Sequence, residues 1–304
     1  MLYQNIIETI GKTPLVKINH NEPGSAEIYV KLESFNPGGS VKDRPALYMI
    51  QAAEKQGLIK KGDTLIEATS GNMGIALAMI GAALDYNVVI VMPDTMSAER
   101  RRIITAYGAE LVLTEGKLGM SGAVAKSEAL AKEKGYFLIR QFENEANLLS
   151  HEETTAIEMI EDLAGEIDAF VAGVGTGGTI SGIGKVLKKH NPAMLTVAVQ
   201  PAKSPVLTGG TPAGHGIQGI GANFIPGIYT KEVVDEVIDM EEERAYEAAR
   251  ALGKKEGLLV GMSSGGNFAA AKEIAKRLGA GKKVVTVLPD TGERYLSTIL
   301  FTQE

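Results

Sequence analysis

Apolar, β-branched runs alternate with amphipathic segments along most of the chain. The apolar runs are typical of buried strands, and the amphipathic segments are typical of helices that cover a sheet. A first series predicts strands at 28–33, 64–68, 88–93 and 110–115 and helices at 41–56, 73–84, 98–106 and 123–133. Because strands and helices alternate, we expect an α/β fold with mostly parallel strands.

A second series begins near residue 146. It predicts helices at 152–163, 179–189, 241–256 and 267–278 and strands at 169–174, 195–200 and 283–289. A stretch rich in Pro and Gly, residues 201–226, interrupts this series. Together the two series predict two open, twisted, mostly parallel sheets, each flanked by helices.

Composition narrows the class of protein. The 304 residues suffice for about two domains, and 44% hydrophobic with 22% charged residues is typical of a globular protein. The net charge of −6 gives no electrostatic reason to expect nucleic acid or an anionic membrane as a partner. The chain contains no Cys, which excludes disulfides and thiolate metal sites.

Neither a membrane span nor a secretion signal is visible. The longest nearly apolar run, residues 74–84, is too short to cross a bilayer, and the N-terminal segment has no signal-peptide core. We therefore expect a cytoplasmic protein.

Glycine is the one compositional outlier, with 36 residues that gather in short loops. In open α/β sheets, ligands bind where strands end and helices begin. Five loops follow this rule: NPGGSVKDR (36–44), TSGNMG (69–74), GVGTGGT (173–179), GMSSGGN (261–267) and PDTGERY (289–295). Several such loops on one chain are more informative than any one alone.

The loop GTGGT (175–179) ends an apolar strand and opens a helix, so its backbone N–H groups can bind a phosphate. A simple tight turn has the same pattern. Gly173, Gly175 and Gly178 also satisfy the G-x-G-x-x-G dinucleotide pattern. However, the next strand ends in VQP (199–201), without the acidic residue that binds a ribose. We therefore favour a phosphate without a ribose over a nicotinamide dinucleotide and its oxidoreductase chemistry.

Lys42 stands at the opening of a predicted helix, directly after a Gly-Gly-Ser sequence. The positive helix end disfavours an ammonium and should lower its pKa, which suits an amine that forms a Schiff base. Taken alone, a lysine is more often solvated and paired with a neighbour such as Asp43. The surrounding loops favour the chemical interpretation.

The loop TSGNMG places Thr69, Ser70 and Asn72 at another helix N-terminus. Their hydroxyls and amide, with the backbone N–H groups, suit a carboxylate, although a plain helix cap has the same residues. Ser263 and Ser264 precede Gly265 and are again consistent with capping a helix.

The remaining polar clusters suggest no further chemistry. The four His residues show no metal-ligand spacing, so we assign no metal site. The run Arg100, Arg101 and Arg102 lies on a predicted helix, where a charge run is normally a solvated face.

Eight segments together resemble the cysteine synthase (O-acetylserine sulfhydrylase) family. They are NPGGSVKDR, EATSGNMGIALA, MPDTMSAERR with AYGAELVL, QFENEAN, GVGTGGTISG, HGIQGIGANFIPG, VGMSSGG and GERYLST. The match runs from IETIGKTPLVKI near the start to GERYLST near the end, in family order and spacing. This family belongs to the β-family, or fold type II, of pyridoxal phosphate (PLP) enzymes, which has the tryptophan synthase β-like fold.

The resemblance implies a role for each matching residue. Lys42 would be the catalytic residue and form the internal aldimine with PLP, Asn72 would hydrogen-bond its 3′-oxygen, and Ser264 would face the pyridine nitrogen. Two groups complete the site: Gly175, Thr176, Gly177, Gly178 and Thr179 would bind the 5′-phosphate, while Thr69, Ser70, Asn72, Met73 and Gln141 would bind the substrate. A smaller mobile domain, 38–145, would close onto a larger PLP-anchoring domain formed by 1–37 and 146–304.

The implied reaction is β-replacement. The substrate amino acid would displace Lys42, whose freed amine would remove the α-proton. A neutral Ser264 would not keep the pyridine nitrogen protonated, which favours loss of the β-substituent and an α-aminoacrylate intermediate. With acetate leaving O-acetyl-L-serine and sulfide adding at Cβ, the expected product is L-cysteine. A thiol is the other nucleophile that the resemblance allows. The resemblance also implies a homodimer and allows serine acetyltransferase as a partner.

Two departures from the family pattern concern substrate choice and local structure. Met73 replaces the Thr of TSGNTG, and ETTAIEM follows His151 where two Thr and Gly-Pro-Glu are usual, so Ala156 and Ile157 differ. The alternative reaction uses L-cysteine or L-serine as the amino-acid substrate, releases hydrogen sulfide or water, and forms lanthionine, cystathionine or serine. Pocket shape near Met73, Gln141 and the loop 214–223 would select between the two.

Overall fold

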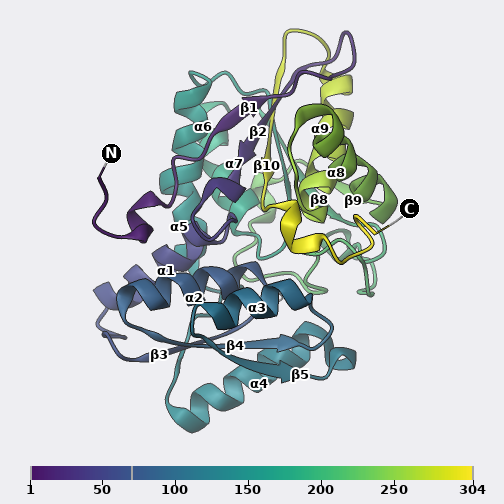
Figure 1. The fold of residues 1–304 in the computed structure, drawn as a ribbon. Helices are drawn as coiled ribbons and strands as arrows, with labels where there is room; N and C mark the ends of the chain where they lie inside the picture. Colours follow the sequence, from purple (N-terminus) through teal and green to yellow (C-terminus); the bar gives the residue numbers. More distant parts are fainter. Residues whose placement is uncertain (1, 70, 303–304) are drawn as a thin grey trace.

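The computed structural model describes residues 2–69 and 71–302. Two sheets organise the chain, as the two sequence series predict (Figure 1). The smaller sheet has the order β5-β4-β3-β6 and is parallel throughout. Its strands are β3 (Thr64–Ala68), β4 (Asn87–Pro93), β5 (Glu110–Thr114) and β6 (Phe137–Leu138).

The larger sheet has the order β1-β2-β10-β7-β8-β9. Its strands are β1 (Leu15–Lys17), β2 (Glu27–Leu32), β7 (Ala169–Gly173), β8 (Leu195–Pro201), β9 (Glu236–Met240) and β10 (Lys283–Leu288). All neighbours are parallel except β1 and β2, which pair antiparallel. The predicted mostly parallel α/β architecture is therefore confirmed.

Helices cover both faces of each sheet. Around the smaller sheet lie α1 (Asp43–Lys55), α2 (Asn72–Leu84) and α3 (Ala98–Ala106) on one face and α4 (Gly119–Lys134) on the other (Figure 1). Around the larger sheet lie α5 (Glu145–Ser150), α6 (Ala156–Asp162) and α7 (Gly178–His190) on one face, and α8 (Glu242–Glu256) and α9 (Met262–Leu278) on the other. Separate apolar clusters fill the space between each sheet and its helices.

The helix expected at 152–163 is wrong in detail. The chain instead forms α5, a π-helical turn at His151–Thr155 and then α6, which ends at Asp162. The periodicity of the sequence marks a helical region but carries no signal for the extra residue that a π-helical turn inserts.

The helix expected at 267–278 begins earlier, at Met262. Gly265 and Gly266, which favour a loop in sequence, lie inside α9 because α8 packs against them. A Cβ at Gly265 would come within 2.0 Å of the Ala245 carbonyl oxygen, so this close helix contact requires glycine. Tertiary packing here outweighs the low helix propensity of glycine.

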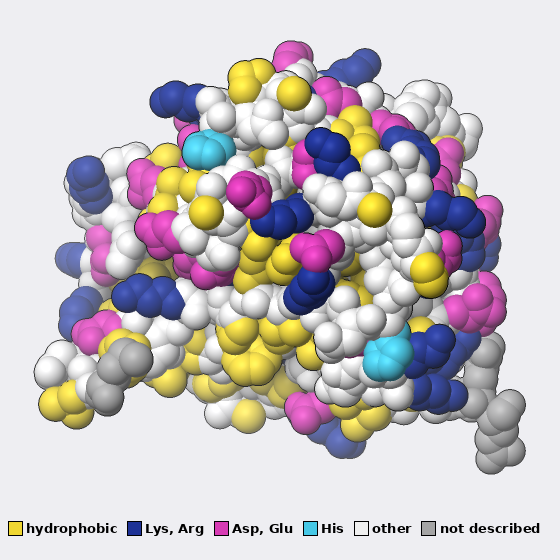
Figure 2. Space-filling view, turned by 90° about the horizontal axis from the view of Figure 1, so that it is seen from above, with side chains coloured by type: hydrophobic (Ala, Val, Ile, Leu, Met, Phe, Trp, Pro, Cys, Tyr) yellow, Lys and Arg dark blue, Asp and Glu magenta, His cyan; other side chains and the backbone are white. Residues whose placement is uncertain are grey.

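The surface agrees with the modest net charge. Figure 2 shows Lys and Arg interspersed with Asp and Glu over one face of the molecule, with no large patch of a single sign. Within residues 2–69 and 71–302, no helix is long and apolar enough to cross a membrane.

Candidate functional site

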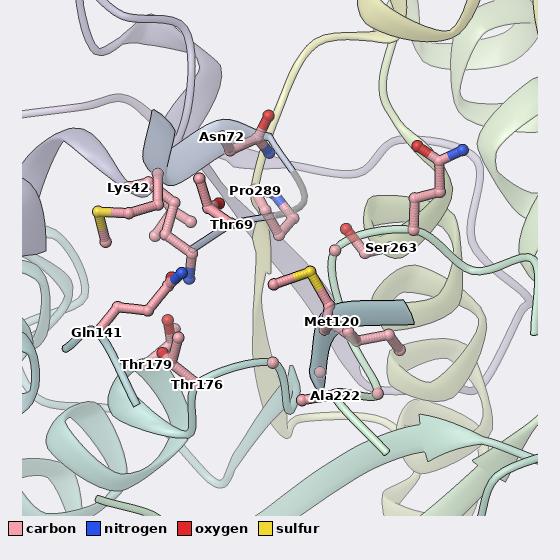
Figure 3. A pocket seen from close by; sticks show the side chains of 18 of the residues that line it. Lys42, Thr69, Asn72, Met120, Gln141, Thr176, Thr179, Ala222, Ser263 and Pro289 are labelled. Carbon is pink, nitrogen blue, oxygen red and sulfur yellow. The ribbon is translucent and has the colours of Figure 1, made fainter. Parts of the chain in front are cut away.

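A cavity of about 330 Å³ lies where strands of both sheets end. Thr69 follows β3, Gly175 follows β7 and Pro289 follows β10, and all three line the cavity. Figure 3 shows side chains from both halves of the molecule around this space. The cavity therefore occupies the position at which open α/β sheets bind ligands.

Most of the residues singled out in the sequence meet at this cavity. They are Lys42, Thr69, Asn72, Met73, Gln141, Gly175, Thr176, Gly177 and Thr179. Gly178 and Ser264 do not line the cavity themselves but are the immediate neighbours of residues that do. Ser70 lies outside the described residues.

Lys42 directly precedes α1 and is half-buried at the cavity wall. Burial lowers the pKa of its ammonium to about 8, against the opposing influence of the Asp290 carboxylate. Asp43 does not pair with it, because the Asp43 carboxylate is itself buried and accepts a hydrogen bond from the Gly38 N–H. The lysine thus has the environment expected of a nucleophilic amine rather than of a solvated cation.

The loop 175–179 is shaped as an anion cradle. Gly177 has a φ of +88°, and a Cβ at this residue would come within 2.9 Å of the Tyr229 backbone. The Thr176 hydroxyl accepts a hydrogen bond from the Asn147 amide at 3.1 Å. The N-cap residue of α7, Gly177, has no side chain to cap the helix, and the Gly178 N–H donates to the Thr176 hydroxyl at 3.4 Å. The positive end of the helix therefore faces this loop, where an anion would be stabilised.

A buried histidine supports this cradle from behind. His151 lies in the π-helical turn, with Nδ1 2.9 Å from the Thr155 hydroxyl and Nε2 3.3 Å from the Thr179 hydroxyl. Burial lowers the pKa of His151 to about 3, so its ring is neutral at physiological pH. The sequence does not predict this role, because nothing around a lone His indicates which hydroxyls will surround it.

Two buried polar atoms of α9 have no hydrogen-bond partner in the described part of the chain. Ser264 lies in the first turn of α9, is wholly buried, and its Oγ has no hydrogen-bond partner within the described part of the chain. The Asn267 Oδ1 atom, one turn further along α9, is likewise unpartnered. Because buried hydroxyls are normally satisfied, the Ser264 hydroxyl fits a heteroaromatic nitrogen or another polar ligand atom.

The expected carboxylate site is built from the ends of β3 and β6. The Thr69 Oγ1 atom accepts from the Gly71 N–H at 3.1 Å, and the Gln141 amide donates to the Ala68 carbonyl at 2.9 Å. Buried Glu67 accepts from the Arg140 N–H at 2.8 Å and so fixes the turn before Gln141. Burial raises the pKa of Glu67 to about 8, against these hydrogen bonds. The outcome is a preformed set of polar groups beside Lys42.

The expectation for Arg100 is wrong. Only 2% of its surface is exposed, and its guanidinium donates to Gln218 and, at 2.6 Å, to the Tyr295 hydroxyl. It also lies 4.7 Å from the centre of the Tyr295 ring. A run of three Arg residues does not reveal which one turns inward, and here the partners come from residues more than 100 positions away.

Comparison with known proteins identifies the family. Residues 6–290 match the family described as pyridoxal-phosphate dependent enzyme. A cysteine synthase of Staphylococcus aureus (strain N315) is 55% identical over 300 residues, which cover 98% of this chain and 97% of that protein.

Solved structures show the same similarity. An O-ureido-L-serine synthase is 46% identical with a TM-score of 0.97, and the alignment covers 100% of this chain and 97% of that one. A hydrogen sulfide-producing enzyme from Fusobacterium nucleatum is 48% identical with a TM-score of 0.94, covering 97% of this chain and 100% of that one.

Proposed function

The chain belongs to the pyridoxal-phosphate dependent enzymes, and we propose that it makes L-cysteine from O-acetyl-L-serine and sulfide by β-replacement. The observation that carries this proposal is the meeting, at one cavity, of a half-buried Lys42 with a phosphate cradle and a set of polar groups suited to a carboxylate. Lys42 has one role in holding the cofactor and another in moving a proton.

The described residues fit pyridoxal phosphate at both ends. We propose that the N–H groups and hydroxyls of 175–179 hold its phosphate and that Ser264, whose hydroxyl has no partner, faces its ring nitrogen. Asn72 would hold its 3′-oxygen. When bound, the cofactor supplies a carbonyl group that couples to amines and a ring that withdraws electrons from the substrate Cα.

The chain's own groups then position the substrate and move its proton. Thr69, Asn72 and Gln141 would hold the α-carboxylate, which aims the Cα–H bond at the Lys42 amine. With its pKa lowered to about 8, this amine can accept the α-proton near neutral pH and return it later. The apolar side chains of Met73 and Met120 would exclude water from the β-carbon.

The experiment that tests this proposal locates the lysine. Borohydride reduction of the holoenzyme, followed by peptide mass mapping, should place the reduced cofactor on Lys42. A Lys42→Ala variant should lose cysteine formation and the borohydride-stable adduct. An adduct on another lysine, or none in a preparation saturated with the cofactor, would overturn the proposal.

A second candidate reaction uses L-cysteine or L-serine as the amino-acid substrate and releases sulfide or water. The similarity of this chain to a solved hydrogen sulfide-producing enzyme favours this second reaction as a candidate. Buried Met73, in the proposed substrate loop, also favours it. Comparing kcat/KM for acetate release from O-acetyl-L-serine with kcat/KM for sulfide release from L-cysteine decides between them.

We also propose that residues 38–145 form a domain that closes over the cavity and that the protein acts as a homodimer.

Serine acetyltransferase is a further proposed partner, and a pulldown with and without O-acetyl-L-serine as a competitor tests it. We place the reaction in the cytoplasm.

A further inference from the structure

The segment PDTGERY (289–295) lies between the two loops that would hold the cofactor. Its backbone forms β-bridges from Asp290 to Ser40 and from Thr291 to Val260. The Pro289 carbonyl also accepts a hydrogen bond from the Val41 N–H at 2.8 Å. The segment therefore contacts the chain next to Lys42 on one side and the chain just before α9, which carries Ser264, on the other.

Asp290 is wholly buried at this position. Its Oδ2 atom accepts from the Tyr295 hydroxyl at 2.6 Å and from the Asn72 amide nitrogen at 2.7 Å. The Arg100 guanidinium lies 3.9 Å away and supplies the opposite charge. A carboxylate held this way has a fixed orientation, because two donors and a cation share one oxygen.

Arg294 holds the other end of the same amide. Its Nη1 donates to the Asn72 Oδ1 atom at 2.7 Å, while its Nη2 donates to the Gly38 carbonyl. A Cβ at Gly39 would lie 2.6 Å from that Nη2 atom, so the fork of the guanidinium occupies space that only glycine leaves open. Arg294 thus ties Asn72 to the loop that leads into Lys42.

Within the described part of the chain, these contacts engage one of the two Asn72 N–H donors. Its oxygen faces Arg294, and one amide hydrogen faces Asp290. A side-chain amide has two N–H donors, so one hydrogen remains, on a side chain that lines the cavity. With the wrong amide orientation the oxygen would face Asp290, and two acceptors would meet.

We propose that Asp290 and Arg294 are positioning residues, which hold the Asn72 amide with its remaining N–H directed at the 3′-oxygen of pyridoxal phosphate. Through Gly38, Arg294 also fixes the loop that carries Lys42. This inference rests on the proposed function, because it assigns Asn72 to the cofactor. Separately, the Asp290 charge opposes the burial that lowers the pKa of Lys42, which places the carboxylate close enough to influence that amine.

A double-mutant cycle tests the inference. Apoprotein of Arg294→Gln, Asn72→Ala and the double variant is titrated with pyridoxal phosphate, and the visible absorption band of each reconstituted protein is recorded. We expect Arg294→Gln to weaken cofactor binding about tenfold and to shift the band, because the Asn72 amide oxygen loses the donor that helps to fix its orientation. In the Asn72→Ala background the same substitution should weaken binding less than about threefold, since its target is already gone.

Controls separate positioning from general destabilisation. Arg277→Gln removes a surface guanidinium that pairs with Glu236 at 2.6 Å, and it should change neither the binding constant nor the band. Arg294→Lys keeps the charge but not the forked guanidinium, and it should show the same loss of cofactor affinity as Arg294→Gln. It replaces Arg294→Gln in the test if that variant folds poorly. Urea unfolding of each apoprotein reports stability independently.

The outcomes distinguish the two levels of the argument. If Asn72→Ala leaves binding and the band unchanged, then the proposed cofactor role of Asn72 fails, and the inference fails with it. If Asn72→Ala weakens binding but Arg294→Gln does not, or if the two effects add fully, then the inference alone is overturned. Loss of urea stability with unchanged cofactor affinity would also assign Arg294 a purely structural role.

Discussion

Lys42 has a basic side chain at a position where burial disfavours its charged form. Its cavity wall removes water from the ammonium. The Asp290 carboxylate favours the charged form, but its Oδ2 atom is engaged by Asn72 and Tyr295. The surroundings of Lys42 thus increase the fraction of the neutral amine near neutral pH, and the neutral amine is the reactive form.

The rate at which apoprotein takes up pyridoxal phosphate covalently should depend on this pKa. Attack on the carbonyl needs the neutral amine, whose fraction rises with pH until the pKa is passed. With the pKa at about 8, the rate should rise about tenfold from pH 6 to pH 7 and level off above pH 8. Stopped-flow absorbance with borohydride trapping measures it. A rate still rising at pH 10 would instead indicate an ordinary, solvated lysine.

Residue roles were predictable from sequence where several signals coincide. Lys42, Asn72 and the loop 175–179 each follow a predicted strand or precede a predicted helix, and parallel strands end at the same edge of a sheet. Arg100 and His151 were not predictable, because their partners come from distant parts of the chain. Pattern along the sequence cannot show which polar side chain a fold will bury.

At the scale of elements, the strand-to-helix turn before α7 is the most constrained piece of the site. Gly177 and Gly209 have nearly equal φ angles, +88° and +87°, but differ in surroundings. A Cβ at Gly177 would meet the Tyr229 backbone at 2.9 Å, whereas a Cβ at Gly209 would meet nothing within 4 Å. The pair therefore separates the cost of the backbone angle from the cost of the contact.

Gly209→Ala should lower the free energy of unfolding by about 1–2 kcal/mol and leave cofactor affinity unchanged, because only the left-handed angle is penalised. Gly177→Ala should cost more and should also weaken pyridoxal phosphate binding, because the loop must move away from Tyr229. Urea unfolding and cofactor titration of both apoproteins measure this. Equal behaviour of the two variants would contradict an anion cradle at 175–179.

The bounds of an element were predictable where its apolar pattern is uninterrupted, and less so where the pattern is short or broken. The run TLIEA at 64–68 is β3 without change, and β4 and β7 agree to one residue. The short edge strands β1, β6 and β9 were missed, because two to five residues carry too little pattern to stand out. Where glycine or a π-helical turn interrupts a helix, tertiary packing decided the boundary and the sequence pattern misled.

At the scale of the whole molecule, a largely buried ion cluster joins the two sheets. Arg44, in the first turn of α1, donates two hydrogen bonds to Glu33 at 2.8 and 2.9 Å and two to Glu158 on α6 at 2.7 and 2.8 Å. Glu33 follows β2 of the larger sheet, whereas α1 packs into the apolar cluster of the smaller one. If residues 38–145 move as proposed, this cluster keeps the start of α1 attached to the larger sheet and its helices. Lys42, directly before α1, would then stay with the larger sheet.

Arg44→Met tests how much the assembly depends on this cluster. The substitution leaves the fully buried Glu33 carboxylate without its cation, and we expect a loss of about 3–5 kcal/mol in the free energy of unfolding at pH 7. Arg277→Met at the surface removes a comparable pair and should cost about 1 kcal/mol or less. Urea unfolding of apoprotein measures both variants.

The pH dependence of that loss identifies its cause. Burial by itself raises the pKa of both carboxyls, but Arg44 outweighs it and holds the pKa of Glu33 below its ordinary value and that of Glu158 at about 2. Because these pKa values are depressed, their contribution to stability is present above the ordinary carboxyl pKa and is lost as pH falls toward 2. Without Arg44 the carboxyls can take up protons at higher pH, which relieves the buried charge. The difference in stability between wild type and Arg44→Met should therefore shrink between pH 7 and pH 4. A constant difference would mean that packing, and not the uncompensated charge, is what the guanidinium contributes.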